Sequence, residues 1–169
     1  MEVKGVDAAK RYEVLSYLKK LNRKLGTTMF LITHDMEAAL ICDKSAILRD
    51  GKLLEFDSND NLIASLPSGG LLTRLTIEDL TENKIKIIKN FTPVQKTIRV
   101  GNEIIEVFIE DFEENLQKLI EYTIKNNLKV TSMSKDNATF RRYFQIRIQE
   151  EQEKERKLRE SEQIMEGEA

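Results

Sequence analysis

An unbroken run of apolar and β-branched residues at positions 27–33, Thr-Thr-Met-Phe-Leu-Ile-Thr, constrains the fold of this 169-residue chain most strongly. Such a run, without alternating polar residues, is typical of a strand that is buried on both faces of a parallel sheet. An amphipathic stretch at residues 8–25 precedes it, with leucines at spacings of three and four, and Gly26 marks its end. A helix followed by a buried strand predicts an α/β fold for this part of the chain.

The single histidine, His34, follows the predicted strand directly and stands before a short helix that Asp35 can cap. In parallel α/β sheets, ligands bind at the carboxyl ends of the strands. An imidazole at that edge can donate a hydrogen bond to a phosphate oxygen or orient an attacking water. From its position alone, His34 is equally well explained as such a functional residue and as a loop histidine without a role.

Two further strands are predicted at residues 45–49 and 52–56, because the Asp50-Gly51 pair between two apolar runs is a strong hairpin signal. A short helix at residues 59–66 then ends at Pro67-Ser68-Gly69-Gly70. This Pro/Ser/Gly cluster predicts the internal boundary of the chain.

Beyond the boundary, residues 71–149 follow an α+β order of elements. The predicted elements are a strand or connector at 71–79, strands at 85–91 and 97–110 with a hairpin bend at Gly101-Asn102, a helix at 112–126, a strand at 128–132 and an amphipathic helix at 139–148. Residues 150–169 hold eight acidic and four basic residues, which predicts a charged tail that is a frayed helix or disordered.

The charges nearly balance, with 27 basic against 29 acidic residues and a net charge of -2, which argues against a nucleic-acid-binding surface. No apolar stretch approaches the roughly 20 residues of a membrane-spanning helix, and residues 1–10 do not form a secretory signal. The single cysteine, Cys42, cannot form an internal disulfide, and no cluster of Cys and His predicts a metal site. We therefore expect a cytoplasmic protein that reaches a membrane only through a partner.

Several pieces of the sequence, in this order, resemble the ATPase domain of ABC transporters. Gly5-Val6-Asp7 looks like the D-loop, and Thr33-His34-Asp35 looks like the switch loop, or H-loop. Cys42-Asp43-Lys44 and Gly51-Lys52 look like parts of the last two core strands. The resemblance covers about the first 65 residues and implies that residues 1–68 are the C-terminal part of a P-loop NTPase (ABC) domain.

The resemblance implies roles for two residues. His34 would contact the γ-phosphate of ATP and help to organise the attacking water, and Asp7 would lie at the interface between two nucleotide-binding domains. Asp7 could also be the N-cap of the helix that starts at Ala8, and both roles can hold together. Intact members of the family bind ATP and magnesium.

The catalytic loops of the family are missing from these residues. There is no Gly-x-x-x-x-Gly-Lys-Ser/Thr phosphate loop and no Leu-Ser-Gly-Gly signature, since Ser68-Gly69-Gly70 comes after His34. Met1 stands where the catalytic glutamate would fall, Glu2 is one position off, and the magnesium-binding aspartate has no counterpart. We therefore expect this chain alone to bind neither ATP nor magnesium and to be inactive as an ATPase.

Residues 71–149 are similar to the small, ferredoxin-like C-terminal domain of drug- and lipid-export ABC subunits. Residues 139–144 occupy the place of a short Leu-Glu-Asp-Val-Phe helix, although Arg141-Arg142 replaces its acidic pair. The alternative is an amphipathic helix that covers a small sheet. Arg141, Arg142 and Arg147 would then be a solvated face rather than an anion site.

The resemblance implies the C-terminal fragment of an ATP-binding subunit that energises export through a permease at the cytoplasmic face of the membrane. Its partners would be the permease and a second ABC ATPase domain or a complementing N-terminal fragment, and a homodimer is a further possibility. The alternative function is a non-enzymatic regulatory or protein-interaction module derived from an ABC ATPase.

Overall fold

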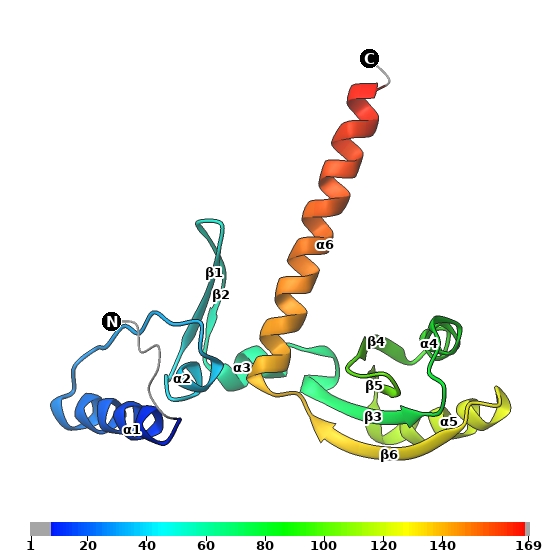
Figure 1. The fold of residues 1–169 in the computed structure, drawn as a ribbon, viewed down its shortest axis with the longest axis horizontal. Helices are drawn as coiled ribbons and strands as arrows, with labels where there is room; N and C mark the ends of the chain where they lie inside the picture. Colours follow the sequence, from blue (N-terminus) through cyan, green and yellow to red (C-terminus); the bar gives the residue numbers. More distant parts are fainter. Residues whose placement is uncertain (1–7, 168–169) are drawn as a thin grey trace. The chain divides into compact units, whose positions relative to one another are not determined.

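The computed structural model describes residues 8–167, and the chain divides into two compact units, Met1–Asn59 and Asp60–Ala169 (Figure 1). The sequence indicated the boundary at Pro67-Ser68-Gly69-Gly70, whereas this division places the whole cluster, a 3-10 turn, in the second unit. The described elements of the first unit are α1 (Ala8–Leu25), α2 (Met36–Leu40), β1 (Ser45–Arg49) and β2 (Lys52–Asp57), and α3 (Asn59–Ala64) spans the division.

The β1–β2 hairpin confirms the strands predicted around Asp50-Gly51. The two strands pair antiparallel, with Arg49 opposite Lys52 across the turn. Asp50 and Gly51 both have positive φ, 49° and 74°, which is the backbone that a tight two-residue hairpin requires and that Asp-Gly adopts most easily.

The segment 27–33 forms no strand, so the expected buried strand is wrong for this chain. Phe30 is 94% exposed and Ile32 is 99% exposed. A strand needs a neighbour that accepts and donates its backbone hydrogen bonds. Within the described range 8–167 no strand pairs with this segment, since β1 pairs with β2 and the other four strands form a separate sheet.

The second unit contains a four-stranded sheet with the strand order β4-β5-β3-β6, in which every neighbouring pair is antiparallel. Strand, helix, strand, strand, helix, strand is the element order of ferredoxin-like motifs. The elements are β3 (Leu71–Ile77), α4 (Glu82–Lys89), β4 (Val94–Arg99), β5 (Ile104–Ile109), α5 (Phe112–Lys125), β6 (Val130–Asn137) and α6 (Phe140–Gly167). The β4–β5 hairpin bends at the predicted Gly101-Asn102, and β3 is a strand that pairs with both β5 and β6.

One face of this sheet shares an apolar core with α4 and α5. Alternate residues of β3 and β5 point to it, together with the inner faces of both helices, which is the two-layer arrangement of α+β units. The buried members are Leu75, Ile77, Leu80, Ile85, Ile88, Ile105, Val107, Ile109, Leu119 and Leu128.

Residues 85–91 were predicted as a strand, but the chain forms α4 there, so that prediction is wrong. Thr81 caps the helix by accepting a hydrogen bond from the Lys84 backbone N–H at 3.4 Å. Ile85 and Ile88, three positions apart, are both buried, and the lysines of α4 lie on its other sides. The isoleucine-rich run is compatible with the apolar spacing of either a strand or a helix, and packing on the sheet selected the helix.

The other face of the sheet is covered by the first turns of α6. Phe140, Tyr143 and Ile146, at helical spacing, are all buried, and the Phe140 and Tyr143 rings stack with centroids 6.1 Å apart. Glu106 of β5 is also buried, and Arg142 of α6 lies 2.7 Å from its carboxylate. A buried carboxylate without such a partner would be strongly disfavoured.

The charged tail is the outer part of the same helix, since α6 runs unbroken from Phe140 to Gly167 (Figure 1). Along it, Glu151 pairs with Lys154 at 3.3 Å and Arg156 with Glu160 at 3.4 Å. Pairs three or four residues apart support an exposed helix that is polar on all sides. Across residues 8–167, we find no helix with both the length and the apolar character needed to cross a bilayer.

We predict that Glu150→Gln lowers the free energy of unfolding at pH 7 by about 0.5–1 kcal/mol. Burial of this carboxyl raises its pKa, but hydrogen bonds from Lys96 and Arg147 outweigh burial, and the net pKa lies below its ordinary value. A lowered folded-state pKa stabilises the fold above the unfolded-state pKa, and this stabilisation is lost as pH falls through the folded value. Urea unfolding at pH 7 and at pH 3 measures the difference, which should be smaller at pH 3. An equal effect at both values would contradict the ionic origin.

Candidate functional site

The turn that carries His34 is organised around Asp35. The Asp35 carboxylate accepts a hydrogen bond from the Glu37 backbone N–H at 2.9 Å and so caps α2, as the sequence predicted. The Asp35 backbone N–H donates to the Thr33 hydroxyl at 3.0 Å, and its carbonyl accepts from the Ala39 N–H at 3.1 Å. Asp35 thereby joins the residues before and after His34.

A residue from α1 completes this turn. Arg11 donates from its guanidinium to the second carboxylate oxygen of Asp35 at 2.9 Å, across 24 positions of sequence. The hydrogen bond from Glu37 lowers the pKa of Asp35, burial opposes it, and Arg11 lowers it further. Asp35 is therefore ionised at neutral pH, and a partly exposed ion pair ties α1 to the turn.

His34 itself has an exposed side chain and lies between Thr33 and the capping Asp35. Asp7, the other residue singled out by the resemblance, lies outside the described residues, as do Met1 and Glu2. The part that Arg11 plays was not foreseen, because the sequence shows a basic helix but not which of its cations faces residue 35.

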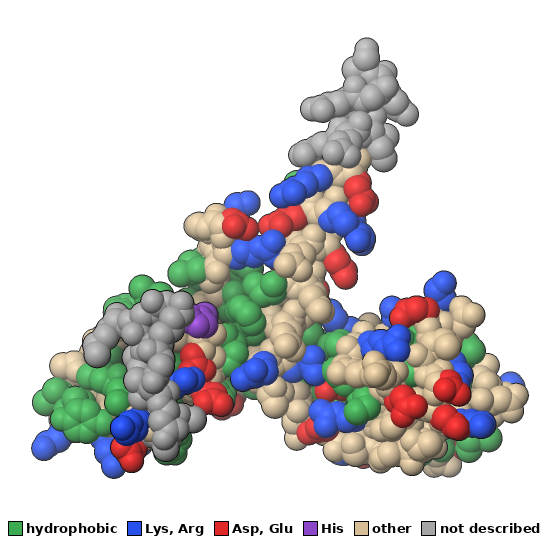
Figure 2. Space-filling model, in the orientation of Figure 1, with side chains coloured by type: hydrophobic (Ala, Val, Ile, Leu, Met, Phe, Trp, Pro, Cys, Tyr) green, Lys and Arg blue, Asp and Glu red, His purple; other side chains and the backbone are tan. Residues whose placement is uncertain are grey.

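Exposed apolar side chains are numerous around this turn. Figure 2 shows hydrophobic side chains gathered on the surface of the first unit, around the purple His34. The large ones that are exposed are Tyr12, Val14, Tyr17, Leu25, Met29, Phe30, Leu31, Ile32, Leu40, Leu48, Leu53 and Phe56. Residues 29–32 are four consecutive exposed apolar side chains, and an exposed apolar run of this kind is typical of a surface that other protein covers.

The residues around His34 do not fit a complete nucleotide site by themselves. The nearby cation Arg11 is engaged by Asp35, and the described part of the chain offers no glycine-rich loop with a lysine for phosphates. Nor do His, Cys, Asp and Glu side chains between residues 8 and 167 gather into a group of three that could hold a metal ion.

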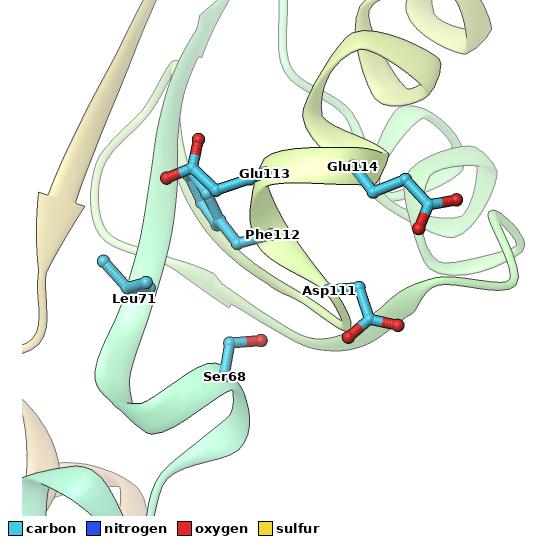
Figure 3. Close-up of a pocket in the computed structure, with 6 residues that line it drawn as sticks. All are labelled: Ser68, Leu71, Asp111, Phe112, Glu113 and Glu114. Atoms are coloured by element: carbon cyan, nitrogen blue, oxygen red, sulfur yellow. The ribbon is translucent and has the colours of Figure 1, made fainter.

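A shallow pocket in the second unit lies between the start of β3 and the N-terminus of α5 (Figure 3). Its volume is about 450 Å³, and it is lined by Ser68, Leu71, Asp111, Phe112, Glu113 and Glu114. The lining holds no basic side chain that could bind a phosphate, and two of its three carboxylates already pair with lysines, Glu113 with Lys135 and Glu114 with Lys118. The pocket therefore does not supply the missing phosphate site.

The arginines of α6 do not form an anion site as a group. Arg142 is paired with the buried Glu106, and Arg147 donates to Glu150 at 2.6 Å. Arg141 has an exposed side chain. Two of the three positive charges are thus already balanced within the second unit.

Comparison with known proteins finds relatives over part of the chain. This chain is 46% identical over 55 residues to "Methionine import ATP-binding protein MetN 1" of Yersinia pestis bv. Antiqua (strain Antiqua). The matched stretch covers 32% of this chain and 16% of that protein. This chain is also 33% identical over 92 residues to "Methionine import ATP-binding protein MetN 3" of Oceanobacillus iheyensis, a stretch that covers 54% of this chain and 24% of that protein. The match to "Methionine import ATP-binding protein MetN" of Bordetella pertussis is 31% over 89 residues, covering 50% and 25%. No protein-family model matches the chain.

The relatives correct the expected type of transporter, because they are import proteins and not drug or lipid exporters. The matched part spans a quarter or less of the length of each. The mixed α/β and α+β fold agrees with the class expected from the sequence. The chain is homologous, over part of its length, to the C-terminal region of the ATP-binding subunits of ABC transporters.

Proposed function

We propose that this chain is the C-terminal part of an ATP-binding subunit that energises import through a membrane permease. Methionine is the proposed cargo, because the matched relatives are named as methionine import proteins. The observation that carries the proposal is the turn in which Asp35 holds the segment of His34 directly after residues 27–33. The subunit would lie at the cytoplasmic face and would pair with a second ATP-binding domain.

In this proposal His34 contacts the γ-phosphate and Asp7 lies at the interface of the two ATP-binding domains. The phosphate loop, the signature and the magnesium-binding carboxylate come from a segment that precedes residue 1 in the same polypeptide or from a separate chain. The apolar surface formed by residues 29–32 supports this, because a preceding strand would cover it. Such a segment would provide the groups that bind ATP and magnesium, which the described residues lack.

Joining this chain to the N-terminal part of a matched import protein tests the proposal. We expect the 169-residue chain alone to show no ATP hydrolysis and the joined polypeptide to hydrolyse ATP. His34→Ala should lower that rate by about 100-fold or more, as expected for a group that stabilises the transferring phosphoryl. Lys20→Ala, an exposed position on α1, is the matched control and should leave the rate unchanged. Hydrolysis by the short chain, or none by the joined one, would contradict the proposal.

The alternative is a regulatory or interaction module whose working part is the second unit. The observation that favours it is the closed core of that unit, which is complete without any residue of the first. A stable, monodisperse chain that binds no nucleotide, together with an inactive joined polypeptide, would support this alternative.

A further inference from the structure

We propose that Arg11 is a positioning residue for His34, acting through Asp35; this inference rests on the proposed function of the His34 site. Arg11 belongs to α1, the helix that follows the predicted D-loop, while His34 belongs to the turn before α2. The ion pair between Arg11 and Asp35 joins these two elements directly at 2.9 Å.

In the 169-residue chain the anchoring of His34 is one-sided. On its N-terminal side the chain at residues 27–33 is exposed and belongs to no strand. On its C-terminal side Asp35 is held by its bonds to Thr33, Glu37 and Ala39, all within the same turn. Those bonds shape the turn, but they do not fix it to the rest of the unit.

Arg11 supplies the attachment to α1, while at the other end of α2 the Asn59 side-chain amide donates a hydrogen bond to the Ala39 carbonyl at 3.1 Å. The Arg11 guanidinium reaches the Asp35 oxygen that does not cap α2, so capping and ion pairing use different oxygens and do not compete. A charge-assisted hydrogen bond is directional as well as attractive. Loss of the pair therefore leaves the cap intact and lets the turn, with His34, shift relative to α1.

The position of His34 matters because phosphoryl transfer depends on placing groups around the transferred phosphoryl. A displacement of a positioned group by about 1 Å can cost a factor of 100 in rate. The predicted D-loop precedes α1. A movement of α1 would therefore shift His34 through the ion pair between Arg11 and Asp35. Arg11 thus offers a physical link between the domain interface and the switch histidine.

The first test uses the 169-residue chain and hydrogen exchange measured by mass spectrometry, which tolerates self-association. In Arg11→Gln, exchange at residues 35–40 should rise about two- to fivefold, the effect of losing one partly exposed ion pair. Lys20→Gln, on the same helix, is the matched control and should change nothing there. Unchanged exchange in Arg11→Gln would overturn the proposal.

The second test uses the joined polypeptide and separates kcat from KM. Arg11→Gln should lower kcat about tenfold and leave the KM for ATP within about twofold, because the pair orients a reacting group and does not bind ground-state ATP. Asp35→Asn keeps a capping oxygen and should give the same loss, and the double variant should be no worse than either single one. Additive losses, or an unchanged kcat in Arg11→Gln while His34→Ala is inactive, would overturn the proposal. Absence of hydrolysis in the unaltered joined polypeptide would count against the proposed function instead, and the exchange measurement would then decide the role of Arg11.

Discussion

Tyr143→Ala is expected to lower the free energy of unfolding of the second unit by about 3–5 kcal/mol. Tyr143 has 0% of its surface exposed and is among the largest fully buried side chains of the described structure. Its ring is fully buried and stacks on Phe140, so its removal deletes packing contacts and leaves a cavity in the interior of the second unit.

The loss should also loosen α6, because the helix is held to the sheet by Phe140, Tyr143 and Ile146 and by the pair between Arg142 and Glu106. Urea unfolding followed by circular dichroism measures the change in stability. Tyr12→Ala is the matched control, since Tyr12 is 71% exposed on α1, and its effect should stay within about 0.5 kcal/mol. Equal effects of the two substitutions would show that α6 does not pack on the sheet as described.

The second large effect is expected from Phe30→Asp combined with Ile32→Asp. In the 169-residue chain the change in unfolding free energy should stay within about 0.5 kcal/mol, because both side chains already face solvent. Self-association should fall, since two charges interrupt the exposed apolar segment. In the joined polypeptide the same substitutions should cost about 4 kcal/mol or more, because both carboxylates would have to enter a buried strand.

Sedimentation and urea unfolding of both forms provide the measurements. Leu158→Asp, an exposed apolar residue on the outer part of α6, is the matched control and should be tolerated in both forms. If the double variant is tolerated equally well in the joined polypeptide, the segment is not a core strand of a completed ATPase domain. The proposal that a preceding segment covers it would then fail.

The elements that the sequence predicted correctly are those in which nearby residues settle the backbone. Asp50-Gly51 dictates a hairpin because both residues accept positive φ, and β1 and β2 then pair across that turn. Asp35 caps α2 because its carboxylate reaches the backbone N–H two positions away. The helix at Phe112–Lys125 follows from its apolar face, whose buried positions include Leu119.

The predictions that failed concern segments whose backbone conformation is not fixed by neighbouring residues. The isoleucines of α4 suit a strand or a helix, and burial of Ile85 and Ile88 under the sheet selected the helix. Residues 27–33 have the composition of a strand, but a strand forms only beside a neighbouring strand. Within residues 8–167 no strand pairs with this segment. Composition therefore indicated the burial of Ile85 and Ile88 but not their helical conformation, and for residues 27–33 it indicated neither, since Phe30 and Ile32 are exposed.

The sequence by itself indicated the relationship to ABC ATP-binding subunits, which the partial similarity to import ATP-binding proteins supports. It also determined the hairpins and caps, whose hydrogen bonds close within a few residues. Only the tertiary structure decided which face of the sheet α6 covers and which cation meets Asp35. Arg11 and Asp35 stand 24 positions apart, and a sequence carries no measure of the distance between two such charges. That distance is set by the packing of α1 in the first unit, because long-range contacts depend on how whole elements are placed rather than on the residues beside them.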